Sequence, residues 1–369
     1  MLCMLVKNTN GALKSCSLGS WKLAKINKGE IFISLITKHY FMKKIFLLML
    51  TGFVFNQNTS AQFFKKDAGL AHTFSIVARD PVTGEMAVGV QSHWFSVGTA
   101  VSWGEAGVGV VATQSFVNKS YGIKGLGLMK NGKTAPEALS ELLAADDGRE
   151  VRQVAMIDVN GNVNSFTGKN CIDHAGNIVG KNYSVQSNMM LGDKVNAAMS
   201  KAFEGSEGKP LAERVLRALK AAQAVGGDIR GKQSAAILVV AGKSTGQPWN
   251  ERLIDLRVND NKAPLDELDR LLRLFRAYEH MDKGDLATEK NDMKGAMEEY
   301  GAAMKMFPEN LEMKYWTAIT LANNKEVKEA SDLLRKIYIK DANWRELTKR
   351  LPKVNLLNVS AADLQILLK

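Results

Sequence analysis

The sequence predicts an α+β protein, in which antiparallel sheet is covered by helices and an all-α helical tail follows. Between residues 73 and 260 short strand-like and helical segments alternate in the rough order βββ, α, βββ, αα, ββ. Turn signals such as Asp80-Pro81 and Asn160-Gly161 join neighbouring strands as hairpins, which favours antiparallel pairing over a doubly wound parallel sheet. Beyond Pro264 the apolar residues recur with helical spacing instead.

Each element of the α+β domain, residues 73–260, is assigned from its local pattern. Short apolar or alternating runs bounded by turn residues predict strands. They lie at 73–78, 85–91, 107–115, 154–159, 163–166, 183–190, 234–240 and 253–258. A first helix is expected after Thr134-Ala135-Pro136-Glu137, a capping box with proline in the first turn. Two further helices are expected at 193–203 and 211–225.

The tail, residues 264–350, contains an internal repeat. Ala296, Tyr300, Ala303 and Pro308 correspond to Ala330, Leu334, Ile337 and Ala342. The constant offset between the two sets equals the period of tetratricopeptide repeats, in which small residues lie between packed helices. The pattern predicts about two such repeats, with an irregular insertion near 286–291 and a capping helix from Trp344. A plain helical bundle is the alternative.

The region before Gln62 predicts an export signal. Residues 42–61 begin with Met42-Lys43-Lys44, continue with an apolar core and end in Thr59-Ser60-Ala61. This is the layout of a signal peptide and is too short for a convincing membrane span. We expect cleavage before Gln62 and a periplasmic or extracellular protein without a stable membrane anchor; an uncleaved anchor is the alternative. Residues 1–41 have no place in this layout and are interpreted as a mis-called upstream start.

The net charge gives no case for nucleic acid. The formal charge is +11, but eight lysines and one acid lie ahead of Gln62. Without them 41 basic and 37 acidic residues remain, a net charge of +4. Nucleic-acid binding needs a concentrated basic face, so it is not expected.

The sequence contains no conventional motif for metal binding, for nucleotide binding or for a catalytic triad. The histidines at 72, 93, 174 and 280 lack metal-ligand spacing and are assigned structural or surface roles. The glycine-rich stretch 122–127 lacks the Lys-Ser/Thr ending of a phosphate loop. Cys171, the lone cysteine after Ala61, is interpreted as a small buried hydrophobe. No metal and no cofactor are expected.

Five segments taken together resemble the bacterial family called domain of unknown function 1028. The resemblance covers about residues 73–278. The segments are TFSIVARD at 73–80, GVVATQ at 109–114, FTG at 166–168, GGDIRGKQSAA at 226–236 and DLRV at 255–258. The chain departs from the family pattern at Gln186-Ser187-Asn188 and Asn259-Asp260. The resemblance implies a fold like the N-terminal nucleophile (Ntn) hydrolases, an αββα sandwich; the activity of the family is not established.

In Ntn hydrolases the nucleophile is the first residue of the mature chain, and its own α-amine is the base. A hydroxyl attacks poorly until a nearby base takes its proton, and an α-amine with a reference pKa of about 7.7–8.0 suits this task. Thr73 begins the first strand and is the candidate nucleophile. Signal cleavage leaves residues 62–72 ahead of it, so a second cut between His72 and Thr73 is required. The alternative is that Thr73 is an ordinary β-branched strand residue.

Five further polar residues are candidates for substrate binding. Ser92, Gln114 and Asn188 lie at strand ends, where polar site residues collect. Asp228 and Arg230 lie in the most distinctive segment and pair either with each other or with a substrate carboxylate.

Two functions of different classes follow. The first is an exported Ntn-type hydrolase acting on a peptide or small amide. The second is a non-catalytic binding protein that uses the repeat tail to bind a protein or peptide. A homodimer is a further expectation, because antiparallel edge strands often associate.

Overall fold

The structure, a computed structural model, describes residues 69–369. The upstream extension, residues 1–41, and the expected signal peptide, residues 42–61, lie outside this range. Between residues 69 and 369 no helix combines the length and the apolar character needed to cross a membrane.

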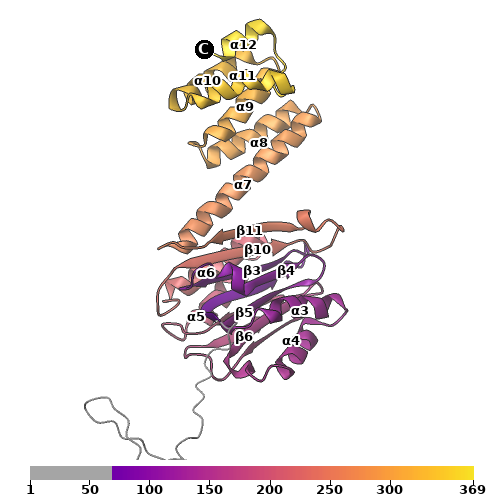
Figure 1. Ribbon diagram of the computed structural model, residues 1–369, viewed down its shortest axis with the longest axis vertical. Coiled ribbons are helices and arrows are strands. Elements are labelled where there is room, and N and C mark those ends of the chain that lie inside the picture. The colour runs from indigo at the N-terminus through magenta and orange to yellow at the C-terminus, as the bar shows by residue number, and fades with distance from the viewer. Residues whose placement is uncertain (1–68) are drawn as a thin grey trace, which may run out of the picture. The chain divides into compact units, whose positions relative to one another are not determined.

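Two antiparallel sheets form the α+β domain (Figure 1). The five-stranded sheet has the order β1 (Gly69–Ala71), β5 (Gly109–Val117), β6 (Arg152–Asp158) and β7 (Val163–Thr167), with β4 (Ser102–Glu105) also paired to β5. The six-stranded sheet has the order β11 (Arg252–Val258), β10 (Ser234–Val240), β3 (Met86–Ser92), β2 (Thr73–Arg79), β9 (Tyr183–Ser187) and β8 (Gly176–Gly180). In the β2–β3 hairpin Thr73 lies opposite Ser92.

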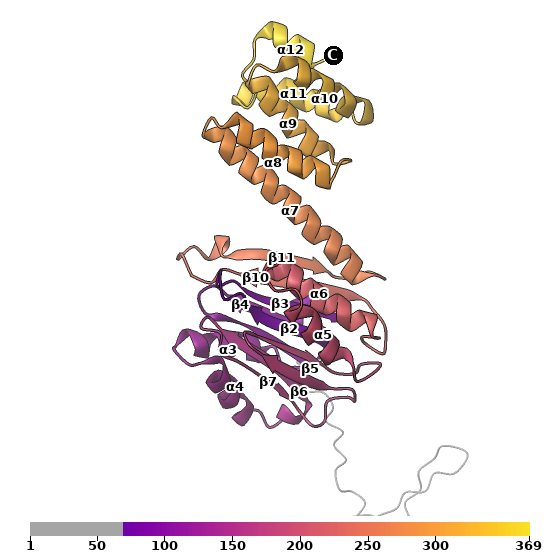
Figure 2. The ribbon, with the colours of Figure 1, turned by 180° about the vertical axis from the view of Figure 1, so that it is seen from behind.

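The two sheets pack face to face, and helices cover their outer faces (Figures 1 and 2). Neighbours on β2 show the alternation: Val77 packs between the sheets, and Ile76 packs toward the helices on the six-stranded sheet. The helices on that sheet are α5 (Val195–Glu204) and α6 (Leu211–Ala224). Those on the five-stranded sheet are α3 (Ser120–Lys130) and α4 (Ala135–Ala144), so the domain has four layers.

The expected strands and helices of this domain are confirmed within a few residues. The capping box is present, since Thr134 accepts a hydrogen bond from the Glu137 amide and Glu137 caps Thr134 in return. The strand expected over 183–190 ends at Ser187, which leaves Asn188 just beyond it. Strands β1, β4 and β8 and the short helix α2 (Gly98–Val101) were not expected, because each has at most five residues.

Helix α3 was also missed, and its glycines explain why. Glycine disfavours a helix interior, yet the stretch 122–127 lies within α3. A Cβ atom on Gly122 would lie 2.2 Å from the Trp103 ring, and one on Gly125 would lie 2.8 Å from Met156. The glycines therefore let the helix approach the five-stranded sheet closely.

The C-terminal region is helical, as predicted. Its helices are α7 (Pro264–Glu289), α8 (Met293–Met306), α9 (Leu311–Asn323), α10 (Val327–Lys340), α11 (Asn343–Arg350) and α12 (Ala361–Leu367). Short 3₁₀ turns lie at Arg149–Val151, Pro248–Asn250 and Leu351–Val354. The first half of α7 packs on the core of the α+β domain through Leu265, Leu268 and Leu272, and its second half packs on α8 and α9. No irregular insertion separates α7 from α8, because α7 runs on to Glu289.

Candidate functional site

The peptide bond between His72 and Thr73 lies where the chain passes from one sheet to the other. Residues up to Ala71 belong to β1 of the five-stranded sheet, and Thr73 begins β2 of the six-stranded sheet. His72 is the only residue between them, and it is 1% exposed. Thr73 is fully buried. The start of β2 is therefore enclosed by both sheets.

Two side chains donate hydrogen bonds to the carbonyl oxygen of His72. Ser92 Oγ, opposite Thr73 on β3, lies 2.5 Å from it, and Arg230 Nη2 lies 2.8 Å from it. Asp228 holds the guanidinium with bonds of 3.0 Å and 2.7 Å, and is itself 3% exposed. Of the two alternatives left open by the sequence, Asp228 and Arg230 pair with each other, and the arginine also reaches the His72 carbonyl.

The loop that carries this pair depends on glycine. Gly227 has φ +65° and Gly231 has φ +114°, in the left-handed region that side chains disfavour. The two glycines flank the Asp228–Arg230 pair and allow the loop to turn toward the start of β2. This explains physically why the GGDIRG segment is distinctive.

A chain of amide side chains fills the space between the sheets beside His72. His72 Nδ1 lies 2.7 Å from Asn188 Oδ1, and Asn188 Nδ2 donates to Gln153 Oε1 at 2.8 Å. Gln114 Nε2 donates to the same oxygen at 2.6 Å. Ser75 Oγ then donates to Gln114 Oε1, also at 2.6 Å. Buried polar groups are normally paired in this way, and here the pairing links both sheets.

Two polar atoms at the centre of this network have no partner. Thr73 Oγ1 and His72 Nε2 are buried without a hydrogen bond. An unpaired buried polar group costs stability, so such a group in a native fold calls for an explanation. Burial lowers the pKa of His72 below its ordinary value and outweighs the opposing effect of the hydrogen bond that the ring donates to Asn188. His72 is therefore neutral near pH 7.

The six residues singled out in the sequence lie together around one peptide bond. Ser92 and Arg230 bond the His72 carbonyl, Asp228 holds Arg230, and Asn188 bonds the His72 ring. Gln114 joins them through Gln153. Their roles in catalysis or binding remain predictions.

Sequence reasoning missed other members of the network. They are His72, Ser75, Gln153 and Gln186. His72, expected in a structural or surface role, is buried beside the site. One signal was available for Ser75, a polar residue between Phe74 and Ile76 in a mostly apolar strand.

A cysteine lies near this network, since the Cys171 thiol donates to the carbonyl oxygen of Arg152, the chain neighbour of Gln153. Cys171 is buried, as expected, and burial raises the pKa of its thiol, which disfavours the thiolate. Within residues 69–369 no three His, Cys, Asp or Glu side chains are grouped so that they could hold a metal ion.

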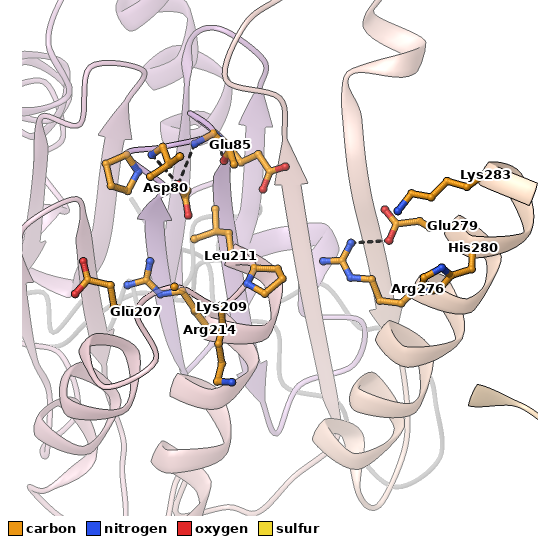
Figure 3. A pocket seen from close by; sticks show the side chains of 15 residues that line it. Asp80, Glu85, Glu207, Lys209, Leu211, Arg214, Arg276, Glu279, His280 and Lys283 are labelled. Carbon is orange, nitrogen blue, oxygen red and sulfur yellow. Dashed lines mark hydrogen bonds and ion pairs between the residues drawn. The ribbon is translucent and has the colours of Figure 1, made fainter. Parts of the chain in front are cut away.

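A pocket of about 740 Å³ lies at the other end of β2 (Figure 3). It is lined by the turn after β2, the segment before α6 and one side of α7. Arg276 Nε pairs with Glu213 at 2.8 Å and its Nη1 pairs with Glu279 at 2.7 Å, so its charge is already neutralised. The whole of β2 separates Asp80 from His72, roughly 26 Å at strand spacing. The pocket is therefore distinct from the site at Thr73.

The fold and the buried network define a four-layer α+β domain with a closed polar site at the start of a central strand. The chain belongs to the family of unknown function DUF1028, whose model matches residues 73–268. The match begins at Thr73. A similar solved structure is a protein of Silicibacter pomeroyi assigned to the same family, with 29% identity and a TM-score of 0.50. The alignment covers 55% of this chain and 85% of that one. No curated protein matches the chain.

Proposed function

We propose that the protein is an Ntn-type amide or peptide hydrolase whose nucleophile is Thr73, freed by cleavage of the His72–Thr73 bond. One observation carries the proposal. The Thr73 hydroxyl is buried without a partner beside a carbonyl that accepts bonds from Ser92 and Arg230. A hydroxyl next to a polarised carbonyl is the arrangement that acyl transfer requires.

The first step is self-processing. Thr73 Oγ1 attacks the carbonyl carbon of His72, the C–N bond breaks, and the hydroxyl proton ends on the released α-amine. The His72 acyl group is now an ester on Oγ1. Water hydrolyses this ester, which leaves a carboxylate on His72 and restores the Thr73 hydroxyl. The mature chain then begins with a threonine that has a free amine.

Hydrolysis of a substrate repeats the same chemistry. The α-amine of Thr73 takes the proton of Oγ1, which attacks the substrate amide carbon. The proton passes to the leaving amine as the C–N bond breaks, and water hydrolyses the ester. The α-amine has a reference pKa of about 7.7–8.0, close to working pH, where a general base is most effective.

Ser92 and Arg230 are suited to stabilise the oxyanion in both reactions. Negative charge develops on the carbonyl oxygen in the transition state, and donors fixed in a buried site stabilise it strongly. Asp228 fixes the guanidinium before the reaction. The αββα layering and the family match that begins at Thr73 support an Ntn-like fold.

The non-catalytic binding protein stays the second candidate, and the tail favours it. Helix α8 begins at Met293 and α10 begins at Val327, one tetratricopeptide period later, and both have 14 residues. Ala296 and Ala330 are fully buried at equivalent places in them. This supports tetratricopeptide-like repeats that bind a peptide or protein partner. Both candidates presuppose export by the signal at residues 42–61.

The test compares wild type with Thr73→Ala and Thr73→Ser on a panel of small amides and short peptides. The proposal predicts hydrolysis by wild type, reduced hydrolysis by the serine variant and none by the alanine variant. Thr317→Ala is the matched control, because Thr317 is also a fully buried threonine but lies in α9. Equal activity of wild type and Thr73→Ala, or no hydrolysis by wild type, contradicts the proposal and favours the binding protein.

A further inference from the structure

The residues just before Thr73 are bound like a ligand. Strand β1 pairs antiparallel with β5, with Gly69 opposite Val117 and Ala71 opposite Ser115. On the same strand β4 pairs only with residues 109–112. Removal of residues 69–72 would therefore open this edge of β5 at Ser115 and Val117. Such an edge binds an extended peptide through its main chain.

His72 itself lies in a shaped subsite. Its ring Nδ1 donates to Asn188 Oδ1 at 2.7 Å and the ring meets the Phe116 ring edge to face, with centroids 5.6 Å apart. Its carbonyl lies between Ser92 and Arg230. The ring is almost completely buried, so the subsite encloses a flat side chain and offers it a hydrogen bond.

We infer that residues 69–72 occupy the subsites for the acyl part of the substrate, which is the part N-terminal to the cleaved bond. The substrate is then a peptide whose acyl part is extended and ends, at the cleaved bond, in a flat, hydrogen-bonding residue such as histidine. The inference rests on the proposed function. In self-processing the His72 acyl group moves from the nitrogen to the hydroxyl of the same residue, Thr73. A substrate acyl group is attached to that same hydroxyl, so it occupies nearly the same place.

The arrangement also makes residues 69–72 an internal inhibitor. While the His72–Thr73 bond is intact, the segment fills the subsites and covers Thr73, which is fully buried. When the segment is cleaved and leaves, the subsites and Thr73 become accessible at the same time. The precursor is therefore expected neither to hydrolyse nor to bind peptides there.

Binding of a synthetic tetrapeptide, Gly-Leu-Ala-His, tests the inference. Its sequence is that of residues 69–72, and its carboxylate mimics the product. Calorimetry is expected to show binding to processed wild type and none to Thr73→Ala, which keeps its own segment. Gly-Leu-Ala-Leu should bind roughly tenfold more weakly, because it cannot pair with Asn188. The variant Asn188→Leu should abolish this difference.

N-terminal sequencing of the same samples separates the two proposals. If wild type begins at Thr73 and carries no copurified peptide, but binds both synthetic peptides equally or binds neither, the subsite inference is wrong and the proposed function stands. A released peptide ending in His72 that copurifies with wild type supports the inference as directly as the added peptide does. A wild-type chain intact across His72–Thr73 overturns the proposed function and this inference with it.

Discussion

The guanidinium of Arg230 donates a 2.8 Å hydrogen bond to the carbonyl oxygen of His72, which lies 158 residues earlier in the chain. With Ser92 on the same oxygen, this contact polarises the peptide bond that precedes Thr73. The two donors use both lone pairs of this buried oxygen, and the same arrangement stabilises the negative charge that develops on a carbonyl oxygen during acyl transfer.

Arg230→Lys should slow both self-processing and hydrolysis by about 10²–10³-fold, the usual loss when one oxyanion donor is removed. Lysine keeps the charge but not the forked contact with Asp228. Processing half-times from intact-mass measurements and hydrolysis rates give the comparison. Arg252→Lys is the control, since Arg252 is exposed and pairs only with Asp255. Equal rates for both variants would count against the oxyanion role.

Gln153→Leu should lower the free energy of unfolding by about 1–3 kcal/mol for each donor left unpaired. Gln153 Oε1 accepts from both Asn188 and Gln114, so two donors lose their acceptor. Urea unfolding measures the change. Gln247→Leu, at an exposed glutamine, should stay within about 0.5 kcal/mol of wild type. A similarly small effect for Gln153→Leu would show that the buried hydrogen-bond network around Gln153 contributes little to the free energy of unfolding.

Gly122→Ala and Gly127→Ala should change stability in opposite directions, although both glycines lie in α3. A methyl group at Gly122 meets Trp103, which should cost about 1–3 kcal/mol. At Gly127 no atom lies within 4 Å of the added carbon, so the better helix propensity of alanine should gain up to about 1 kcal/mol. Thermal unfolding of the two variants shows whether each substitution raises or lowers the stability relative to wild type. Stabilisation by Gly122→Ala would contradict the close packing of α3.

The buried His72 should make the unprocessed protein less stable as the pH falls. Because burial lowers the pKa of folded His72, the unfolded chain takes up a proton near pH 6.5 and the folded chain does not. Stability from this residue is therefore present above about pH 6.5 and lost below it. Urea unfolding from about pH 8 to about pH 5 should show Thr73→Ala losing more stability than His72→Gln/Thr73→Ala. Parallel pH curves for the two variants would rule out a buried neutral His72.

Local patterns predicted most of the strands and the helical tail, whereas the six candidate site residues were chosen from strand ends and from the resemblance to the family. The hairpin turns and the alternation of apolar residues act over a few positions, so they are readable from the sequence. The position of His72 was not readable in this way, because its partners Asn188 and Arg230 come from distant segments. The helix at 120–130 was not readable for the same reason. Its residue 122 must be glycine because the Trp103 ring, from another segment, leaves no room for a Cβ atom there.

The intact mass and N-terminal sequence of purified wild-type protein show whether Thr73 becomes the first residue of the mature chain. Expression should include the native N-terminal region, with Thr73→Ala prepared in parallel. Self-processing should give a wild-type chain that begins at Thr73 and an alanine variant that retains His72 and the residues before it. A wild-type chain that stays intact across the His72–Thr73 bond would rule out Thr73 as an Ntn-type nucleophile.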